Sequence, residues 1–224
     1  MNRFFLLATA AVTLAGGVCS GAAFAASSGQ NSAGGQQIVD GALTAVRQIE
    51  ADSRYDALLK QAKGVFIMPE LVKGAFIVGG EGAQGVLLKH KADGSWSQPA
   101  FLTMGSISLG AQAGAKSGPA AMILMTDKAV FDFTQANNFS LNGKAGLTVV
   151  NYSADGQAPI GKGDVVVWSN QSGAFAGVNI GGADVMQNTS LDQSYYGKQV
   201  GAQQILNGNV INQGADKLTA ALPA

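Results

Sequence analysis

The single histidine and its neighbours are the residues whose types come closest to catalytic chemistry. His90 is the only histidine of the 224 residues and lies in Lys-His-Lys-Ala-Asp-Gly at residues 89–94, beside a predicted turn, so we expect it to be exposed to solvent. A serine hydrolase triad would have to recruit this histidine, and the sequence has no G-x-S-x-G elbow. A metal site would need carboxylates almost alone, and no clustered Asp or Glu spacing indicates one. We therefore predict a protein that is not an enzyme and uses no metal or cofactor.

Two glycine-rich segments match parts of nucleotide-binding motifs without their structural context. Residues 80–85 fit G-x-G-x-x-G, but a dinucleotide site needs a helix to open there, because the helix N-terminus holds the pyrophosphate. The following Val86-Leu87-Leu88 predicts a strand instead. Residues 114–117, Gly-Ala-Lys-Ser, resemble the end of a Walker loop, but Leu109 stands where its first glycine belongs. We interpret the first segment as part of a glycine-rich hairpin and the second as an accidental match.

Lysines beside apolar residues form the candidate site that the sequence supports best. A phosphate headgroup needs cations or oriented N–H donors, and an acyl chain needs apolar surface nearby. Lys60 and Lys63 end a predicted helix, and Lys73 follows the first predicted strand beside Leu71 and Val72. Positive charge and apolar residues coincide here more densely than anywhere else after the N-terminal segment.

A second small basic point lies on a predicted hairpin. Lys89 and Lys91 flank the histidine there, and Trp96 is close by in the sequence. Tryptophan favours membrane interfaces because its ring is apolar while its N–H can stay hydrated. Structural roles stay open for all of these residues, since lysines at a helix C-terminus also favour the helix dipole and the tryptophan can pack on its sheet. The predicted lipid-binding residues are Lys60, Lys63, Lys73, Lys89, Lys91 and Trp96.

The composition excludes several classes of protein. Fourteen Lys and Arg balance fourteen Asp and Glu, so the formal net charge is zero, and charged residues make up only 12% of the chain. A neutral chain of this kind is no electrostatic nucleic-acid binder. The 47% share of hydrophobic residues is too high for general disorder, and the 31 glycines lack the three-residue period of collagen. No apolar run reaches the ~20 residues of a transmembrane helix.

The N-terminus has the pattern of a secretory signal peptide. A short Met-Asn-Arg start precedes an apolar stretch from residue 4 to 14, and Ala-Phe-Ala at residues 23–25 fits a cleavage site after Ala25. The only cysteine, Cys19, lies within this segment and makes a poor lipoprotein signal, because Val18 and Gly16 replace the small residue and the leucine expected there. We predict a signal peptide at 1–25 and a flexible leader at 26–36. The expected location is the periplasm, where the protein could associate with a membrane.

The remaining pattern predicts an α+β fold in a single domain. Helical spacing covers residues 38–49 and 56–62, and strands are predicted at 65–68, ended by Pro69, at 75–78 and at 86–88. Period-2 alternation over 101–116 indicates a strand with one wet face, and 120–125 a central strand. A short helix capped at Thr126 is predicted to extend to Phe133. Further β segments are predicted at 141–152, 164–169 and 174–180. A helix at 200–206 and a weakly amphipathic tail at 209–224 follow. Glycines within the strands favour a glycine-rich, mostly antiparallel, curved and barrel-like sheet with N-terminal helices and short packed helices.

Six sequence segments resemble the SYLF domain family in their order and spacing. They are K-G-V-F-I-M-P at residues 63–69, K-G-A-F-I-V-G-G at 73–80, D-G-S-W-S-Q-P at 93–99, G-A-Q-A-G-A at 110–115, G-A-F-A-G-V at 173–178 and Y-Y-G at 195–197. The resemblance covers residues 37–208 and leaves 209–224 as a C-terminal tail. It implies a lipid-binding module: eukaryotic members bind phosphoinositides and some are linked to actin, whereas bacterial members are exported.

The function expected from residues and resemblance together is non-catalytic binding of anionic phospholipid at a membrane surface in the bacterial envelope. The resemblance leaves the natural lipid open, since an exported protein of this type would not meet phosphoinositides. One alternative is an envelope module that contacts a protein partner of unknown identity without lipid. Another is a hydrolase whose paired carboxylates the sequence does not single out.

Overall fold

A twisted sheet between two layers of helices forms the core of this computed structural model, which describes residues 22–75, 79–108, 114–135, 139–140, 147–151, 163–170 and 183–224. The helices are α1 (Ala22–Glu50), α2 (Ser53–Gln61), α3 (Asp127–Phe133), α4 (Thr189–Tyr196), α5 (Ala202–Leu206) and α6 (Asp216–Ala221), with a 3₁₀ turn, η2, at Gln213–Ala215. The strands are β1 (Gly64–Ala75), β2 (Gly79–Lys89), β3 (Ala100–Ser108), β4 (Gly114–Leu124), β5 (Phe139–Ser140), β6 (Val149–Asn151), β7 (Val165–Ser169) and β8 (Asp184–Gln187).

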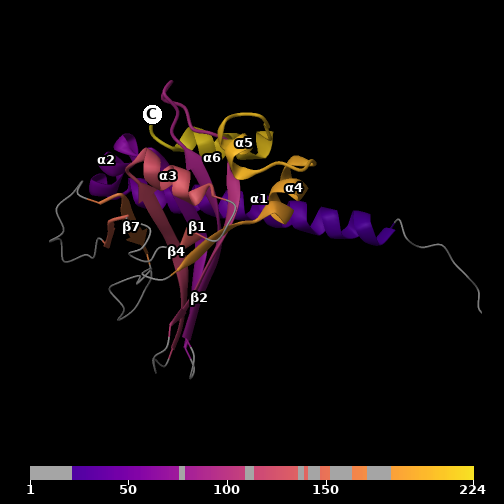
Figure 1. The fold of residues 1–224 in the computed structure, drawn as a ribbon, viewed down its shortest axis with the longest axis horizontal. Helices are drawn as coiled ribbons and strands as arrows, with labels where there is room; N and C mark the ends of the chain where they lie inside the picture. Colours follow the sequence, from indigo (N-terminus) through magenta and orange to yellow (C-terminus); the bar gives the residue numbers. More distant parts are fainter. Residues whose placement is uncertain are drawn as a thin grey trace, which may run out of the picture.

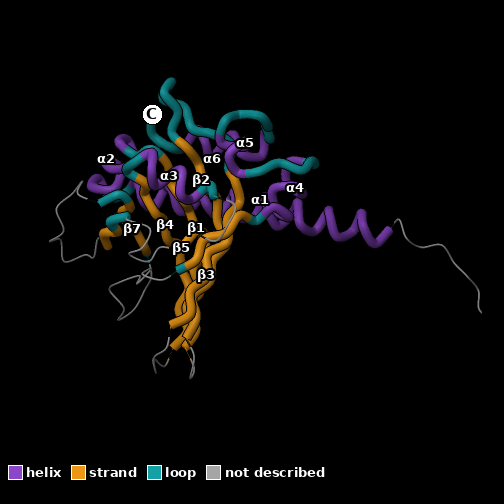
Figure 2. Tube along the Cα trace, in the orientation of Figure 1, coloured by secondary structure: helices purple, strands orange, loops and turns teal. Residues whose placement is uncertain are grey.

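The sheet confirms the predicted α+β class. Its strand order is β5-β8-β3-β2-β1-β4-β7-β6, and every pair is antiparallel except β6 with β7. The edge strands β5 and β6 do not pair with each other within the described residues, so the sheet is open and the prediction of a barrel-like sheet is wrong. Glycines and a bulge can curve a sheet without bringing its two edges together. The helices gather around one half of the sheet, while β1 to β4 extend beyond them at the other end (Figure 2).

Both faces of the helix-covered half are buried, because successive side chains of a strand point to opposite sides. In β1, Phe66 and Met68 pack on the face covered by α3 and α5, whereas Val65 and Ile67 pack on the face covered by α1, α2, α4 and α6. Figure 1 shows α3 in front of the sheet and α1 behind it, with the N-terminal part of α1 extending beyond the rest of the fold. Burial on both faces explains why residues 65–68 are apolar without interruption.

β1 continues through Pro69, where the sequence predicted that the strand ends. The pairing register shifts between Ile67 and Glu70 on the β2 side and between Met68 and Leu71 on the β4 side, so the proline lies in a β-bulge. A proline has no N–H to give to the ladder, and a bulge is where an interior strand tolerates it. The prediction was wrong because the rule against proline in strands does not apply at a bulge.

Glycines allow close backbone approach around this bulge. A Cβ at Gly85 would overlap the carbonyl oxygen of Ile67 and lie 2.8 Å from Cε2 of Phe66. A Cβ at Gly41 of α1 would lie 2.7 Å from Cβ of Pro69, so the helix rests directly on the bulge. Two of the glycines thus serve the close packing for which strand glycines are typical.

The period-2 segment at 101–116 is two strands instead of one. β3 ends at Ser108 and β4 begins at Gly114, and β2 and β1 lie between them in the sheet. The prediction that the even-numbered positions face solvent is also wrong for β3. Leu102 and Met104 are buried in the cluster that includes α5. Alternation alone cannot show where a chain reverses direction or whether a second layer covers it.

The predicted helix cap at Thr126 is found in the structure, but the N-terminal helix is longer than predicted. Thr126 caps α3 by accepting a hydrogen bond from the N–H of Ala129, as predicted, and Gly197 ends α4 in the left-handed conformation. Residues 26–36, predicted to be a flexible leader, are helical as part of α1 despite their Ser and Gly content, because extending a helix from the packed segment after Gly35 costs less than starting a new one. The predicted tail is part of the core, with Leu218 and Leu222 buried.

Other expectations fall partly or wholly outside the described residues. They are the signal peptide up to residue 21, the strand at 76–78 and the β segments at 141–146, 152 and 174–180. The segment at 164–169 is confirmed as β7, and 149–151 forms β6.

Replacing Gly85 with alanine tests the backbone contact at the bulge. The new methyl group would press on the Ile67 carbonyl, which cannot move without displacing β1, so Gly85→Ala lowers the free energy of unfolding by about 3 kcal/mol. Gly105→Ala in β3 is the matched control, because a Cβ there meets nothing within 4 Å. Denaturant unfolding of both variants provides the measurement, and equal midpoints for the two would contradict this account of the bulge.

Candidate anionic-headgroup site

Pairing of β1 with β2 brings the two basic segments of the sequence together. Gly64 is the register partner of Lys89, so the end of α2 lies against the turn that follows β2. The His90 N–H donates to the Lys63 carbonyl at 3.0 Å, and the Lys63 N–H donates to the Leu124 carbonyl at 2.8 Å. Lys63 and His90, 27 positions apart in the sequence, thereby become neighbours at one end of the sheet.

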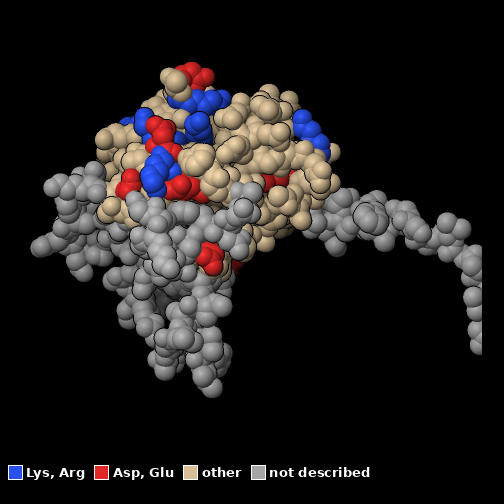
Figure 3. All heavy atoms as spheres, in the orientation of Figure 1, with Lys and Arg blue, Asp and Glu red and all other residues tan. Residues whose placement is uncertain are grey.

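Four of the predicted lysines line one open cavity of about 770 Å³ at this end. Lys60 and Lys63 come from the end of α2, and Lys89 and Lys91 from the end of β2 and the turn after it. In Figure 3, Lys and Arg side chains gather at the upper end of the molecule, with Asp and Glu side chains above, between and below them. The rest of the lining is Gln61, Ala62, His90, Ala92, Gly94, Asp127, Leu206, Asn207 and Ala224.

The charges of this basic cavity are only partly balanced by the protein. Lys60 forms an ion pair with Asp56 one helical turn earlier, at 2.8 Å. Across the described part of the chain, the ammonium groups of Lys63, Lys89 and Lys91 form no ion pair with a carboxylate. Asp127 is the one acidic side chain in the lining as described. The cavity therefore has the charge and size to receive an anionic group.

Local hydrogen bonds hold the turn that carries Lys91. Oδ1 of Asp93 accepts from the Ser95 hydroxyl at 2.6 Å and from its N–H at 2.9 Å, and these bonds hold the pKa of Asp93 below its ordinary value. Gly94 has φ +80°, a left-handed conformation that glycine adopts without strain. The Asp-Gly turn predicted from the sequence is confirmed and shapes one side of the cavity.

His90 is half-buried, contrary to the expectation of an exposed histidine. Its Nδ1 lies 3.0 Å from the Ala62 carbonyl oxygen, and since a carbonyl only accepts, Nδ1 carries the hydrogen of this bond. The ring stacks on Trp96 with centroids 4.6 Å apart, and Nε2 is buried with no partner among the described residues. The stacked ring therefore forms part of the wall of the cavity.

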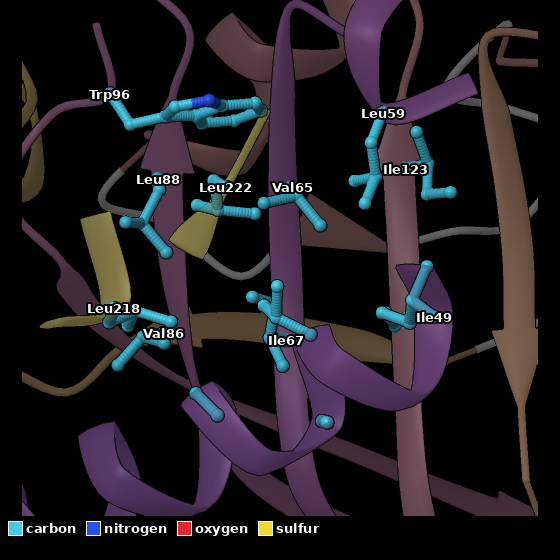
Figure 4. Packing of buried hydrophobic residues seen from close by; sticks show 14 of the residues in the cluster. Ile49, Leu59, Val65, Ile67, Val86, Leu88, Trp96, Ile123, Leu218 and Leu222 are labelled. Carbon is cyan, nitrogen blue, oxygen red and sulfur yellow. The ribbon is translucent and has the colours of Figure 1, made fainter. Parts of the chain in front are cut away.

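Trp96 packs against the sheet, which is the structural alternative that the sequence left open for it. It is 5% exposed, and its Nε1–H donates to the Pro223 carbonyl at 2.7 Å. Figure 4 shows its ring over Leu88 and Leu222 in the cluster on the α1 face of the sheet. Lipid contact by Trp96 stays a prediction, and its packing joins the cavity wall to the C-terminal segment.

Lys73 lies far from the other lysines. It pairs in register with Glu81 and Lys116 toward the opposite end of β1, nine residues from Gly64. At about 3.3 Å per residue this separates the two positions by roughly 30 Å. A lipid contact of Lys73 stays a prediction as well, but the register places Lys73 too far away to line the cavity that the other four lysines share.

A buried carboxyl that the sequence did not single out anchors α4. Asp192 is fully buried, and its Oδ1 accepts the Phe101 N–H at 2.9 Å, while Oδ2 has no partner among the described residues. Burial raises the pKa of Asp192 to about 7, against the lowering effect of the Phe101 hydrogen bond. No pattern around Leu-Asp-Gln-Ser marks this aspartate as buried, because only the docking of α4 on β3 removes it from water.

Neither a metal cluster nor a membrane-spanning helix emerges from the described residues. No three His, Cys, Asp or Glu side chains in that part of the chain come together as metal ligands would. None of its helices combines the length and apolar character needed to cross a bilayer.

Comparison with known proteins places the chain in a family. The family described as Ysc84, Las17-binding protein actin regulator, matches residues 105–224. Protein YSC84 of Saccharomyces cerevisiae is 29% identical over 171 residues, which cover 74% of this chain and 36% of that protein. LAS seventeen-binding protein 3 of the same yeast is 28% identical over 158 residues, 68% of this chain and 34% of that protein. SH3 domain-containing YSC84-like protein 1 of Bos taurus is 25% identical over 156 residues, 68% of this chain and 46% of that protein.

The chain therefore belongs to a family of binding domains, the Ysc84/SYLF family. This family is known for lipid and actin binding and is generally non-catalytic. The chain spans between about a third and a half of the length of these relatives. No solved structure matches it.

Replacing Asp192 with asparagine tests the buried carboxyl. Because its folded pKa lies above the ordinary 3.8, the native state holds a proton that the unfolded state releases, so stability falls as the pH rises from 4 to 7. Asp192→Asn keeps an oxygen for the Phe101 N–H and removes the titration, which reduces this fall by up to roughly 4 kcal/mol. Urea unfolding of both proteins at pH 4, 5.5 and 7 measures how their stability depends on pH. Parallel pH profiles would refute a raised pKa of Asp192.

Proposed function

We propose that this protein binds anionic phospholipid at a membrane surface without catalysis, with the lipid phosphate in the basic cavity. The observation that carries the proposal is the convergence of Lys60, Lys63, Lys89 and Lys91 on one cavity of about 770 Å³. Three of these ammonium groups form no ion pair within the described residues, so a phosphate would not have to displace one, although the charge of Lys91 does help to lower the pKa of Asp93.

The distribution of charge between the two large cavities supports this choice. A cavity of about 740 Å³ lies between α1, the bulge region of the sheet and the start of α4. Its one charged lining residue in the described part is Glu70, which would repel a phosphate. The membership in a family known for lipid binding points the same way.

The expected affinity is modest and depends on salt. Each lysine near an anionic surface contributes about 1 kcal/mol, and exposed charges are screened over a Debye length of about 8 Å at physiological ionic strength. Four lysines together support docking in the millimolar range unless apolar contacts add to them. The relevant membrane would be that of the bacterial envelope if the predicted signal peptide directs export to the periplasm, which the N-terminal sequence of purified mature protein would test.

Neutralising two cavity lysines tests the proposal. Lys63→Gln combined with Lys91→Gln removes about 2 kcal/mol of attraction and weakens binding to vesicles of phosphatidylcholine with 30 mol% phosphatidylglycerol roughly thirtyfold. Lys198→Gln combined with Lys217→Gln is the matched control, because both residues are exposed and line neither large cavity. Flotation at low salt measures the bound fraction for each protein.

Two results would overturn the proposal. One is a wild-type protein that ignores these vesicles at low salt, and the other is an equal loss of binding in both double variants. A stoichiometric protein partner that co-purifies without any lipid would instead favour the protein-interaction alternative.

A further inference from the structure

A smaller cavity continues directly from the basic one. It measures about 320 Å³ and lies between α3 and α5, lined by Val130, Phe131, Thr134 and Gln203 together with residues of the basic cavity. The two cavities share Lys89, Asp127, Leu206 and Asn207. The cationic surface and this cleft therefore belong to one continuous face of the molecule.

Phe131 is the exposed apolar residue of this face. Its side chain is 57% exposed, and the other large apolar side chains exposed in the described residues, Met186 at 37% and Ile211 at 79%, line neither cavity. Single exposed apolar residues are common on protein surfaces, but this aromatic ring lines the same cleft as Lys89 and Asp127, two residues that the cleft shares with the basic cavity. Its position next to the cationic cavity is what distinguishes it.

The packing of α3 fixes this ring in an outward position. Ala129, Val130 and Phe133 are buried against the sheet, so the helical period turns residue 131 to solvent. The cap at Thr126 and the bond from the Thr134 hydroxyl to the Phe131 carbonyl, at 2.6 Å, hold the two ends of the helix. The ring is therefore presented by a rigid element and not by a loop.

We propose that α3 is the membrane-contacting element of the protein and that Phe131 inserts into the interface of an anionic bilayer beside the headgroup held in the basic cavity. This inference rests on the proposed function and adds to it the orientation of the molecule on the membrane. Apolar insertion next to cations is how peripheral proteins supplement weak electrostatic docking. It supplies the contact that four partly screened lysines alone lack.

Tryptophan fluorescence locates the inserted residue. Both native tryptophans, Trp96 and Trp168, are buried, so they give a nearly constant background. Phe131→Trp is expected to show a blue-shifted emission with phosphatidylcholine vesicles that contain 30 mol% phosphatidylglycerol, and quenching when the lipids carry brominated chains. Ile211→Trp is the control, since that exposed position lines neither cavity and should stay unquenched.

Truncation of the ring measures its share of the binding. Phe131→Ala is expected to weaken vesicle binding roughly tenfold, with a loss that persists at 0.5 M salt, because burial of an apolar ring is not screened. Ile211→Ala should bind as the wild type does. Circular dichroism and thermal unfolding of each variant establish that α3 still forms.

The outcomes separate this inference from the proposed function. If the cavity lysine variant loses binding while Phe131→Ala does not and Phe131→Trp is unquenched, the orientation is wrong and headgroup binding stands. If neither the lysine variant nor Phe131→Ala loses binding, both proposals fail. A lipid-free dimer that Phe131→Ala dissociates would show that a second copy of the chain covers this face, and would overturn the insertion.

Discussion

The antiparallel register of β1 with β2 is the constraint on which the rest of the structure depends. Because Gly64 pairs with Lys89, the end of α2 and the turn after β2 meet at one end of the sheet. The same strand is buried on both faces, so α3 and α5 pack on one side of it and α1 and α2 on the other. A slip by one residue would exchange the two faces and separate the lysines.

The bulge at Pro69 divides β1 into two parts with different roles. Between Gly64 and Met68 the strand is enclosed by helices, and beyond the bulge it extends past most of them (Figure 2). Gly85 and Gly41 let neighbouring backbone and helix approach at this point. The basic cavity lies at the enclosed end, where strand pairing and the bond from His90 N–H to the Lys63 carbonyl fix the spacing of the segments that carry its lysines.

Three buried polar atoms in the described part of the chain lack a hydrogen-bond partner where helices or turns pack closely on the sheet. Nε2 of His90, Oδ2 of Asp192 and the Tyr195 hydroxyl are buried without partners among the described residues. Two of these atoms belong to residues that join separate elements: His90 joins the turn after β2 to the end of α2, and Asp192 joins α4 to β3. Buried polar groups of this kind cost stability, and apolar packing around them must offset that cost.

The sequence by itself determined the α+β class, the helix cap at Thr126, the turn at Asp93-Gly94 and the family, because propensity, capping and motif spacing are local properties. Only the tertiary structure decided that Lys63 and Lys89 share a cavity and that Lys73 does not, that Trp96 and Asp192 are buried, and that Phe131 lines a cleft with Lys89. The physical reason is that strand register, the bulge and helix docking join residues far apart in the chain, and no local pattern encodes these distances.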